Sequence, residues 1–245
     1  MIRVLFVIFG AGLVLAAVCF GGAAALGGRD IAENGWTLPA DWIFDSRTGE
    51  LRVDRAAGAA MTRDLAWAGA ESLEIHVPAD IVFTQSDTPS LVVTGPESEV
   101  ANLVVEGGRI TRPEDSLRFG DRAGLTIAVS GPAVRRFELH GSQDLRIENY
   151  DQDVLAVAIH GSGEVEARGR TRELELEIHG SGEADLRGLE TEDARVRIAG
   201  SGEAEVAPRG HADITLHGSG DVTLVTRPAR LTQRIHGSGD IRQAG

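Results

Sequence analysis

A five-residue phrase, His-Gly-Ser-Gly followed by Asp or Glu, returns six times with small variations between Leu139 and Ile241. Its imidazole, hydroxyl and carboxylate groups are side chains used in metal binding, proton transfer and nucleophilic catalysis. Successive phrases begin 20, 19, 20, 18 and 19 residues apart, which is the near-fixed period of a solenoid. If the copies stack, each position of the phrase becomes a column of like residues.

The first column consists of imidazoles, except for Ala199 in the fourth copy. Its histidines are His140, His160, His179, His217 and His236. Neighbouring rings could share zinc or copper, but a straight column supplies two ligands where zinc takes three or four. We therefore expect no metal site and interpret the column as a solvated or stacked surface ladder. Because adjacent cationic rings repel, we expect this ladder to resist full protonation and to respond to pH where histidine titrates.

The last column consists of the carboxylates Asp144, Glu164, Glu183, Glu203, Asp221 and Asp240. Stacked carboxylates could coordinate calcium together with backbone oxygens. The calcium-binding nonapeptide repeat, however, needs a Gly-Gly pair and an Asp every nine residues, and this phrase has neither feature. We expect instead that the acids accept hydrogen bonds from N–H groups of the corner. Their repulsion would be moderated by arginines such as Arg146, Arg168, Arg187 and Arg197.

The serine column superficially resembles part of a hydrolase, because each serine lies between a histidine and an acid. Its members are Ser142, Ser162, Ser181, Ser201, Ser219 and Ser238. A catalytic nucleophile is one residue in one pocket, whereas this serine is copied into every repeat, and the G-x-S-x-G elbow is absent. We interpret the phrase as a tight corner, since glycine takes conformations forbidden to other residues. The corner glycines are Gly141, Gly161, Gly163, Gly180, Gly182, Gly200, Gly202, Gly218, Gly220, Gly237 and Gly239.

Short strands must position these columns, because apolar and polar residues alternate on both sides of the phrases, as at Val157 and Ile159 before one corner and Val165 and Ala167 after it. A unit of about twenty residues cannot bury its own apolar face, so units must stack with equivalent strands in parallel. The sequence therefore predicts an all-β fold, a parallel β-solenoid with rungs of about 19 residues. Gln233 stands where other rungs place Val, Leu or Ile, so we expect the last rung to be distorted or exposed there.

The chain is expected to contain three regions. Residues 1–28 hold a long uncharged apolar run after Arg3, which predicts an N-terminal apolar helix that is either a signal peptide or a transmembrane anchor. Residues 29–64 have a weak pattern and are interpreted as a linker. Residues 65–245 form the predicted solenoid domain, with irregular first coils that cap the stack and regular rungs from about residue 135.

Charge and composition exclude several functions. The formal charge is −13, from 24 Lys and Arg against 37 Asp and Glu, and such a surface repels nucleic acid. A membrane contact is expected only through residues 1–28, if they are not cleaved. Carbohydrate-active β-helices place one unmatched cluster of acids and a base on a rung face, and we find no such cluster in the sequence. We therefore predict that the protein is not an enzyme and has no cofactor.

Two β regions and the run of corners resemble a known family. The stretch Leu73–Phe83, then Val104–Ile110, then the repeated corners are similar to the bacterial putative autotransporter adhesin head GIN domain. The resemblance covers about Leu65 to Gly245 and is carried mainly by the corners. It implies a β-helix in the cell envelope with an adhesin-like role, and it brings no catalytic motif. This chain departs from the pattern by placing His before most corners and Gln143 in the first.

We therefore predict a non-enzymatic structural or binding module that is exported to the periplasm or the cell surface, with inner-membrane attachment if residues 1–28 remain. The expected partner is a glycan or another envelope protein, bound through the flat ladder faces. The chain stops soon after its last corner, so an uncovered rung invites strand addition and predicts a homo-oligomer through the C-terminal rung. The alternatives are a calcium-stabilised extracellular repeat protein and, with less support, a carbohydrate-active β-helix enzyme.

Overall fold

The computed structural model describes residues 42–45, 50–53, 60–113 and 124–243. The chain divides into two compact units, Met1–Ala57 and Gly58–Gly245. In the first unit, β1 (Trp42–Asp45) and β2 (Glu50–Val53) pair antiparallel, within the stretch interpreted as a linker. The predicted apolar helix in residues 1–28 lies outside the described residues. Among the residues that are described, no helix is long and apolar enough to cross a membrane.

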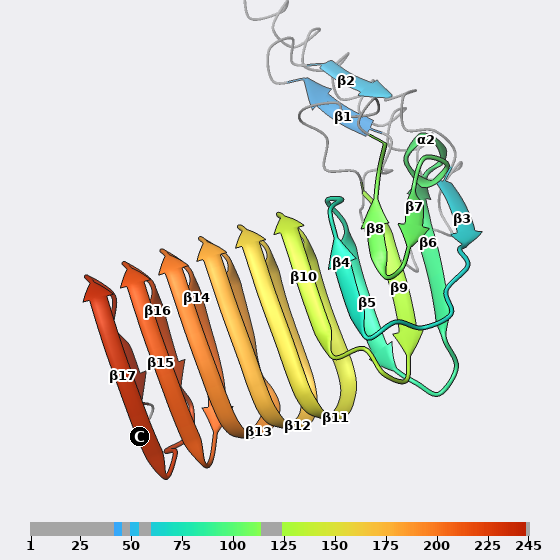
Figure 1. Ribbon diagram of the computed structural model, residues 1–245. Coiled ribbons are helices and arrows are strands. Elements are labelled where there is room, and N and C mark those ends of the chain that lie inside the picture. The colour runs from blue at the N-terminus through green and yellow to red at the C-terminus, as the bar shows by residue number, and fades with distance from the viewer. Residues whose placement is uncertain (1–41, 46–49, 54–59, 114–123, 244–245) are drawn as a thin grey trace, which may run out of the picture. The chain divides into compact units, whose positions relative to one another are not determined.

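The second unit is a parallel β-solenoid, as the repeat predicted (Figure 1). Each turn, here called a rung, has one strand segment before the corner and one after it, so that two layers of parallel strands face each other. Between rungs, paired residues step by 20, 19, 20, 18 and 19 positions along Leu139, Ile159, Ile178, Ile198, Leu216 and Ile235. These steps equal the spacing of the corner phrases.

The regular rungs are built from nine strands, of which β11, β12 and β13 each continue through the second bend of a rung with a shift of register. The strands are β10 (Arg136–Gly141), β11 (Asp144–Gly161), β12 (Glu164–Gly180), β13 (Glu183–Gly200), β14 (Glu203–Pro208), β15 (His211–Gly218), β16 (Asp221–Leu224), β17 (Arg230–Gly237) and β18 (Ile241–Gln243).

The corners need glycine for two separate reasons. Gly180, the first glycine of its corner, has φ = +130°, and a methyl group there would overlap the carbonyl oxygen of Gly161 in the preceding rung. Gly182, the second glycine, would place a Cβ 2.8 Å from the Gly163 oxygen. The recurring pair of glycines therefore allows the corners to stack at the spacing of paired strands.

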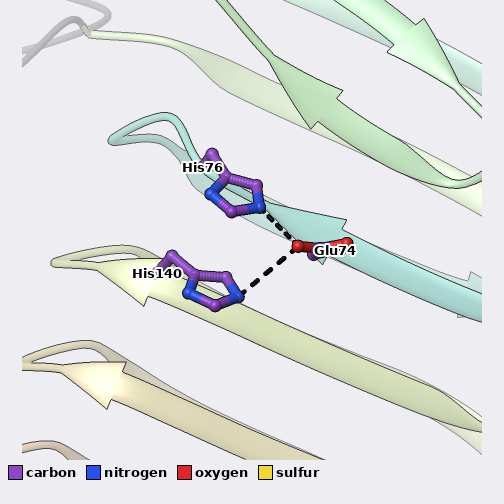
Figure 2. A group of neighbouring side chains, drawn as sticks. All are labelled: Glu74, His76 and His140. Atoms are coloured by element: carbon purple, nitrogen blue, oxygen red, sulfur yellow. Dashed lines mark hydrogen bonds and ion pairs between the residues drawn. The ribbon is translucent and has the colours of Figure 1, made fainter.

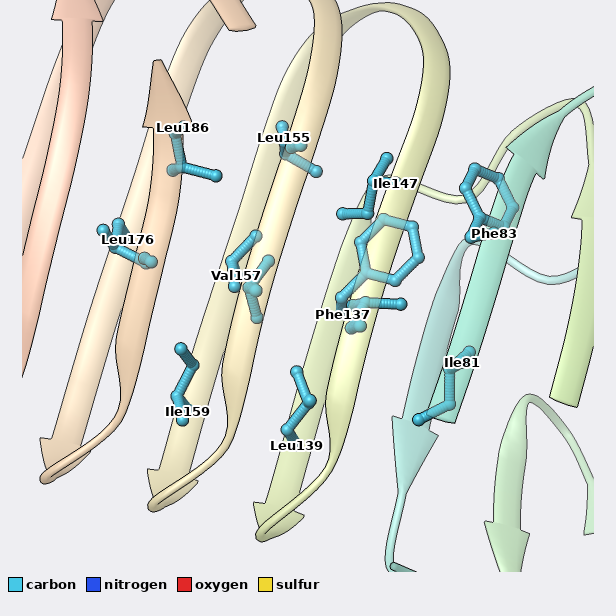
Figure 3. Packing of buried hydrophobic residues seen from close by; sticks show 14 of the residues in the cluster. Ile81, Phe83, Phe137, Leu139, Ile147, Leu155, Val157, Ile159, Leu176 and Leu186 are labelled. Carbon is cyan, nitrogen blue, oxygen red and sulfur yellow. The ribbon is translucent and has the colours of Figure 1, made fainter. Parts of the chain in front are cut away.

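The core is a column of apolar side chains between the two layers (Figure 3). Ile159 of β11 and Ile178 of β12 are paired neighbours with 0% exposure, so each inward position continues from rung to rung. Phe83 and Phe137 meet edge to face with ring centroids 5.0 Å apart, which favours their packing beyond the area they bury. Gln233 of β17 is exposed, as its departure from the apolar pattern predicted.

The first rungs do not follow chain order. β4 (Ser72–Ile75) and β5 (Asp80–Gln85) form a rung that pairs in parallel with β10 and β11. The later strands β8 (Arg109–Thr111) and β9 (Thr126–Gly131) lie on the opposite side of β4 and β5. The chain thus adds β8 and β9 to one side of the rung of β4 and β5, and then continues on the opposite side with β10 and β11.

Antiparallel strands cover this end of the stack. β6 (Ser90–Pro96) pairs antiparallel with both β9 and β3 (Ala60–Asp64), and β7 (Val104–Glu106) pairs with β8. The four-residue helix α2 (Glu97–Val100) follows β6. Because an open sheet edge invites pairing with other chains, these strands protect the first rungs.

Candidate functional site

The histidines of the corners lie in one stacked column on the layer of strands that precedes the corners. Ring centroids are 4.8 Å apart for His140 and His160, 5.2 Å for His160 and His179, and 4.8 Å for His217 and His236. Ala199, which pairs with His179, interrupts the column. The spacing follows from parallel pairing, because like positions in adjacent strands lie one strand spacing apart.

The column has a further member, His76, that the sequence reasoning missed. Its ring stacks on that of His140 with a centroid distance of 4.2 Å and an interplanar angle of 5°. His76 lies at the corner between β4 and β5, which reads His-Val-Pro-Ala instead of His-Gly-Ser-Gly. One signal was present: His76 precedes Asp80 by four residues, as His140 precedes Asp144.

Glu74, His76 and His140 form a cluster of ligand atoms that all lie within 4.8 Å of one another (Figure 2). The Nε2 atoms of His76 and His140 are 2.6 and 3.7 Å from the same oxygen, Oε1 of Glu74. Arg109 donates from Nε to the other oxygen of Glu74 at 2.7 Å. Burial opposes ionisation of Glu74, but the hydrogen bonds from His76 and Arg109 outweigh it and lower the pKa of this carboxyl group.

His140 is the ring of the column with the most restricted surroundings. Its Nε2 atom is buried and has no hydrogen-bond partner among the described residues. Burial and the neighbouring rings of His76 and His160 lower the pKa of His140, although the carboxylates of Glu74 and Glu138 act in the opposite direction. A lowered pKa means that His140 resists protonation, as we expected for a ring in the column. The pH response of the whole column stays a prediction.

The carboxylates lie on the other layer, after the corners, and Asp80 extends the column by one rung because it pairs with Asp144. The expectation that they accept hydrogen bonds from the corner N–H groups is wrong for most of them. Corner N–H groups donate to carbonyl oxygens of the preceding rung, as Ser162 does to Gly141 at 2.9 Å. The exceptions are Asp221, whose Oδ1 accepts from the N–H of Asp240 at 2.9 Å, and Asp240, whose Oδ1 accepts from the N–H of Ile241 at 2.9 Å. Parallel pairing of the backbone therefore satisfies the corners without the acids.

The four arginines named from the sequence pair with acids of other columns, whereas Arg242 contacts the corner acids Asp221 at 3.3 Å and Asp240 at 3.1 Å. Arg146 contacts Glu166 at 3.0 Å, Arg187 contacts Asp185 at 2.6 Å, and Arg197 contacts Glu177 at 2.9 Å. Arg168 also pairs with Glu166. Within the described part of the chain, five successive corner acids make no ion pair. We call these residues the acid stripe: Asp80, Asp144, Glu164, Glu183 and Glu203.

The acid stripe concentrates negative charge along one line. Burial, followed by the carboxylates of Glu164 and Glu203 on either side, raises the pKa of Glu183 at its middle. A shallow groove runs beside the stripe and is lined by Asp80, Asp144 and Glu164 together with the ion pair of Arg146 and Glu166. Such a line of like charges attracts cationic groups.

The serines do not join histidine and acid into a catalytic arrangement in the described structure. The corner serines are exposed, and none of their hydroxyl groups hydrogen-bonds to a described histidine. Histidines and acids of one corner also lie on different layers, because the corner turns the chain between them. The arrangement that recurs is a set of parallel surface columns, with the cluster at Glu74 as its one local variation among the described residues.

Comparisons with known proteins found one matching family and several similar solved structures. The family model described as "Putative auto-transporter adhesin, head GIN domain" matches residues 71–228. A crystal structure of a putative adhesin from Bacteroides fragilis is similar with a TM-score of 0.61 at 18% identity, over 76% of this chain and 97% of that one. A putative lipid binding protein from Parabacteroides distasonis has a TM-score of 0.47 at 21% identity, over 77% and 98% of the two chains. No match is found among the curated proteins.

Proposed function

Because this chain belongs to the family of putative autotransporter adhesins with a head GIN domain, we propose that it is a non-enzymatic, adhesin-like binding module of the cell envelope. The solenoid supports this role, since parallel pairing presents rows of like side chains that repeat at a near-fixed spacing. Export to the periplasm or the cell surface is part of the same proposal.

One observation supports a protein as the partner more than a glycan. The acid stripe, from Asp80 to Glu203, has no ion pair within the described residues, whereas acids of the adjacent column, Glu166 and Asp185, are paired with arginines. A row of unpaired carboxylates is complementary to lysines and arginines of a protein surface. Glycan binding commonly uses exposed aromatic rings as platforms; among the residues whose burial the structure describes, Tyr150 is buried, and Trp67 is partly buried and donates its Nε1 hydrogen to Ser130. The proposed partner is therefore an envelope protein whose basic surface binds the acid stripe.

The test is binding of the purified full chain to an immobilised envelope preparation from the bacterium that carries it. We expect the double variant Glu164→Lys/Glu183→Lys to lose binding, because it reverses the charge at the centre of the stripe. A matched control, Asp153→Lys/Glu192→Lys, makes the same change of net charge at exposed acids outside the stripe and should keep binding. Binding of the wild-type protein should also be lost in 0.5 M salt, because exposed charges are then screened.

The nature of the partner is read from treatment of the preparation. Protease treatment should abolish binding, whereas periodate oxidation of sugars should leave it intact. If periodate abolishes binding and protease does not, the partner is a glycan and the protein assignment is wrong. Equal binding by the stripe variant and the wild type would remove the stripe from the proposal.

A further inference from the structure

Three side chains that could hold a metal ion come together from two neighbouring rungs (Figure 2). Glu74 extends from β4, His76 from the corner after β4, and His140 from the end of β10. Parallel pairing places Glu74 opposite Glu138 and so brings the corner histidines of both rungs beside its carboxylate. We propose that Glu74, His76 and His140 form a binding site for a divalent transition-metal ion of the zinc type.

The distances are close to those that such an ion requires. Zinc lies about 2.0–2.2 Å from nitrogen and oxygen ligands, so that ligand atoms in a tetrahedral site are roughly 3.4 Å apart. The Nε2 atoms of His76 and His140 are 2.6 and 3.7 Å from Oε1 of Glu74, on either side of that value. The two rings are stacked with an interplanar angle of 5°, and an imidazole nitrogen donates in the plane of its ring, so an ion would bind only after the rings turn out of the stack towards Oε1 and the hydrogen bond of His76 to Glu74 is replaced. Two imidazoles and one carboxylate form a common donor set for zinc, with the remaining positions filled by water.

Neighbouring residues orient the ligand atoms and leave the site open to solvent. Arg109 holds Oε2 of Glu74 at 2.7 Å and leaves Oε1 directed at the imidazoles, which is the task of an outer-shell partner. His140 has a buried Nε2 atom with no hydrogen-bond partner in the described chain, and a bound ion would satisfy it. His76 is exposed, so solvent and an ion can reach the site.

The other stacked histidines provide an internal comparison. The outward residues two positions before His217 and His236 are Thr215 and Arg234, so that pair has a hydroxyl group and a cation where the proposed site has Glu74 and Glu138. Glu177, two positions before His179, is engaged by Arg197 at 2.9 Å. Stacked histidines alone therefore do not make the site. Among the described residues, a third converging ligand is found only at the cluster of Glu74.

A bound ion would join rungs that lie far apart in the sequence. Glu74 and His76 belong to the first rung, and His140 belongs to the rung that the chain reaches after it has built β8 and β9. The ion would therefore link β4 to β10, two strands that are neighbours in the stack although β8 and β9 lie between them in the sequence. We expect zinc to raise the melting temperature of the protein, because a ligand that binds only the folded state stabilises it.

Calorimetric titration of the full chain with zinc chloride tests the site, using protein purified without a polyhistidine tag. We expect one ion per chain for the wild type. His76→Gln and Glu74→Gln should each weaken binding at least as much as the roughly 10–100-fold that outer-shell changes cost. Both residues lie at the surface, and circular dichroism checks that the variants fold. Cobalt should give the absorption bands of a tetrahedral ion in the wild type and lose them in both variants.

His217→Gln and His236→Gln are the matched controls, since they remove stacked histidines that lack the carboxylate. They should leave zinc affinity unchanged, and zinc should still raise their melting temperatures. Absence of zinc uptake by the wild type overturns the proposal. Wild-type affinity in Glu74→Gln, or an equal loss in the two control variants, overturns it as well, because binding would then depend on the histidine column in general.

Discussion

Glu183 and Asp185 project from the same outer face of β13, yet their pKa values move in opposite directions. Glu183 belongs to the acid stripe, where burial and the carboxylates of Glu164 and Glu203 raise its pKa. Asp185 lies one column away and accepts hydrogen bonds from Arg187, which lower its pKa despite partial burial. Asp185 also has acids, Glu166 and Glu205, at the same position of the rungs on either side, so the difference comes from Arg187, two residues further along the same strand, which Glu183 lacks.

Glu183→Gln should stabilise the protein at pH 7. A raised folded-state pKa means that the favourable contribution of Glu183 is complete below its unfolded value of 4.5 and is lost as pH rises through the folded value. The neutral amide of the variant avoids this loss. Because water screens exposed charges, the gain in unfolding free energy should be below about 1 kcal/mol. Urea unfolding at pH 7 and at pH 4 measures the gain, which should vanish at the lower pH.

Asp185→Asn is the matched contrast to this prediction. Its lowered pKa means that its contribution is present above the unfolded value of 3.8 and disappears as pH falls through the folded value. The variant should therefore lose stability at pH 7 and approach the wild type in acid. If Glu183→Gln and Asp185→Asn changed stability in the same direction at pH 7, the acid stripe would not differ from the neighbouring column, whose acids are paired with arginines.

The first of the six corners has Gln143 where the other five have their second glycine. Its side chain is only 1% exposed, and Nε2 donates to the carbonyl oxygens of His140 at 2.8 Å and Ile75 at 3.3 Å. The preceding corner, from His76 to Ala79, has a different sequence and no Gly-Ser-Gly. Gln143 thus joins a regular corner to an irregular one, with a side-chain amide in place of a backbone group.

Gln143→Leu keeps the volume of this side chain and removes the amide. The buried carbonyl groups then lose their donor, but the buried Oε1 atom, which has no hydrogen-bond partner among the described residues, is removed as well, so we expect a net loss of about 1 kcal/mol in unfolding free energy. Chemical denaturation measures the loss. Gln233→Leu provides the control, since Gln233 is exposed and the same substitution there should change stability by less than about 0.5 kcal/mol. Equal effects at both positions would show that the amide of Gln143 does not hold the corner.

The sequence predicts the regular rungs because each contains the same corner with the same alternation around it. From Leu139 to Ile235 the observed register is the spacing of the phrases. The placement of β8 beside β4 is different, since pairing of Glu74 with Arg109 depends on contacts 35 residues apart and no local motif marks it. For the same reason, the columns were predicted whereas Glu74 and His76 were not. Their convergence with His140 arises only when the irregular first rung is stacked on the regular ones.

The stability of the solenoid unit is distributed along the stack. Each rung contacts the rungs on either side, and the inward residues continue without a break from Leu139 to Leu216. In such an array the free energy of unfolding is approximately a sum of rung terms and nearest-neighbour terms. A complete rung should therefore be removable, provided that the chain rejoins at the same point of the next corner.

Deletion of residues 183–202 meets this condition, because it joins Gly182 directly to Glu203 and leaves one complete corner. β12 would then pair with β14 and β15, which repeat the inward and outward pattern of β13. We expect a folded, β-rich protein with a lower melting temperature, measured by circular dichroism. The deletion also removes Ala199, so His179 would stack directly on His217.

Deletion of residues 183–192 is the control for rung identity. It removes half a rung, so every later corner is displaced to the opposite end of the layer and the glycines no longer stack on glycines. A Cβ at the neighbouring positions would then meet backbone oxygens, as it would at Gly182 against Gly163. We expect this shorter deletion to unfold the C-terminal rungs although it removes fewer residues. If it is tolerated as well as the complete rung, the corners do not set the register of the stack.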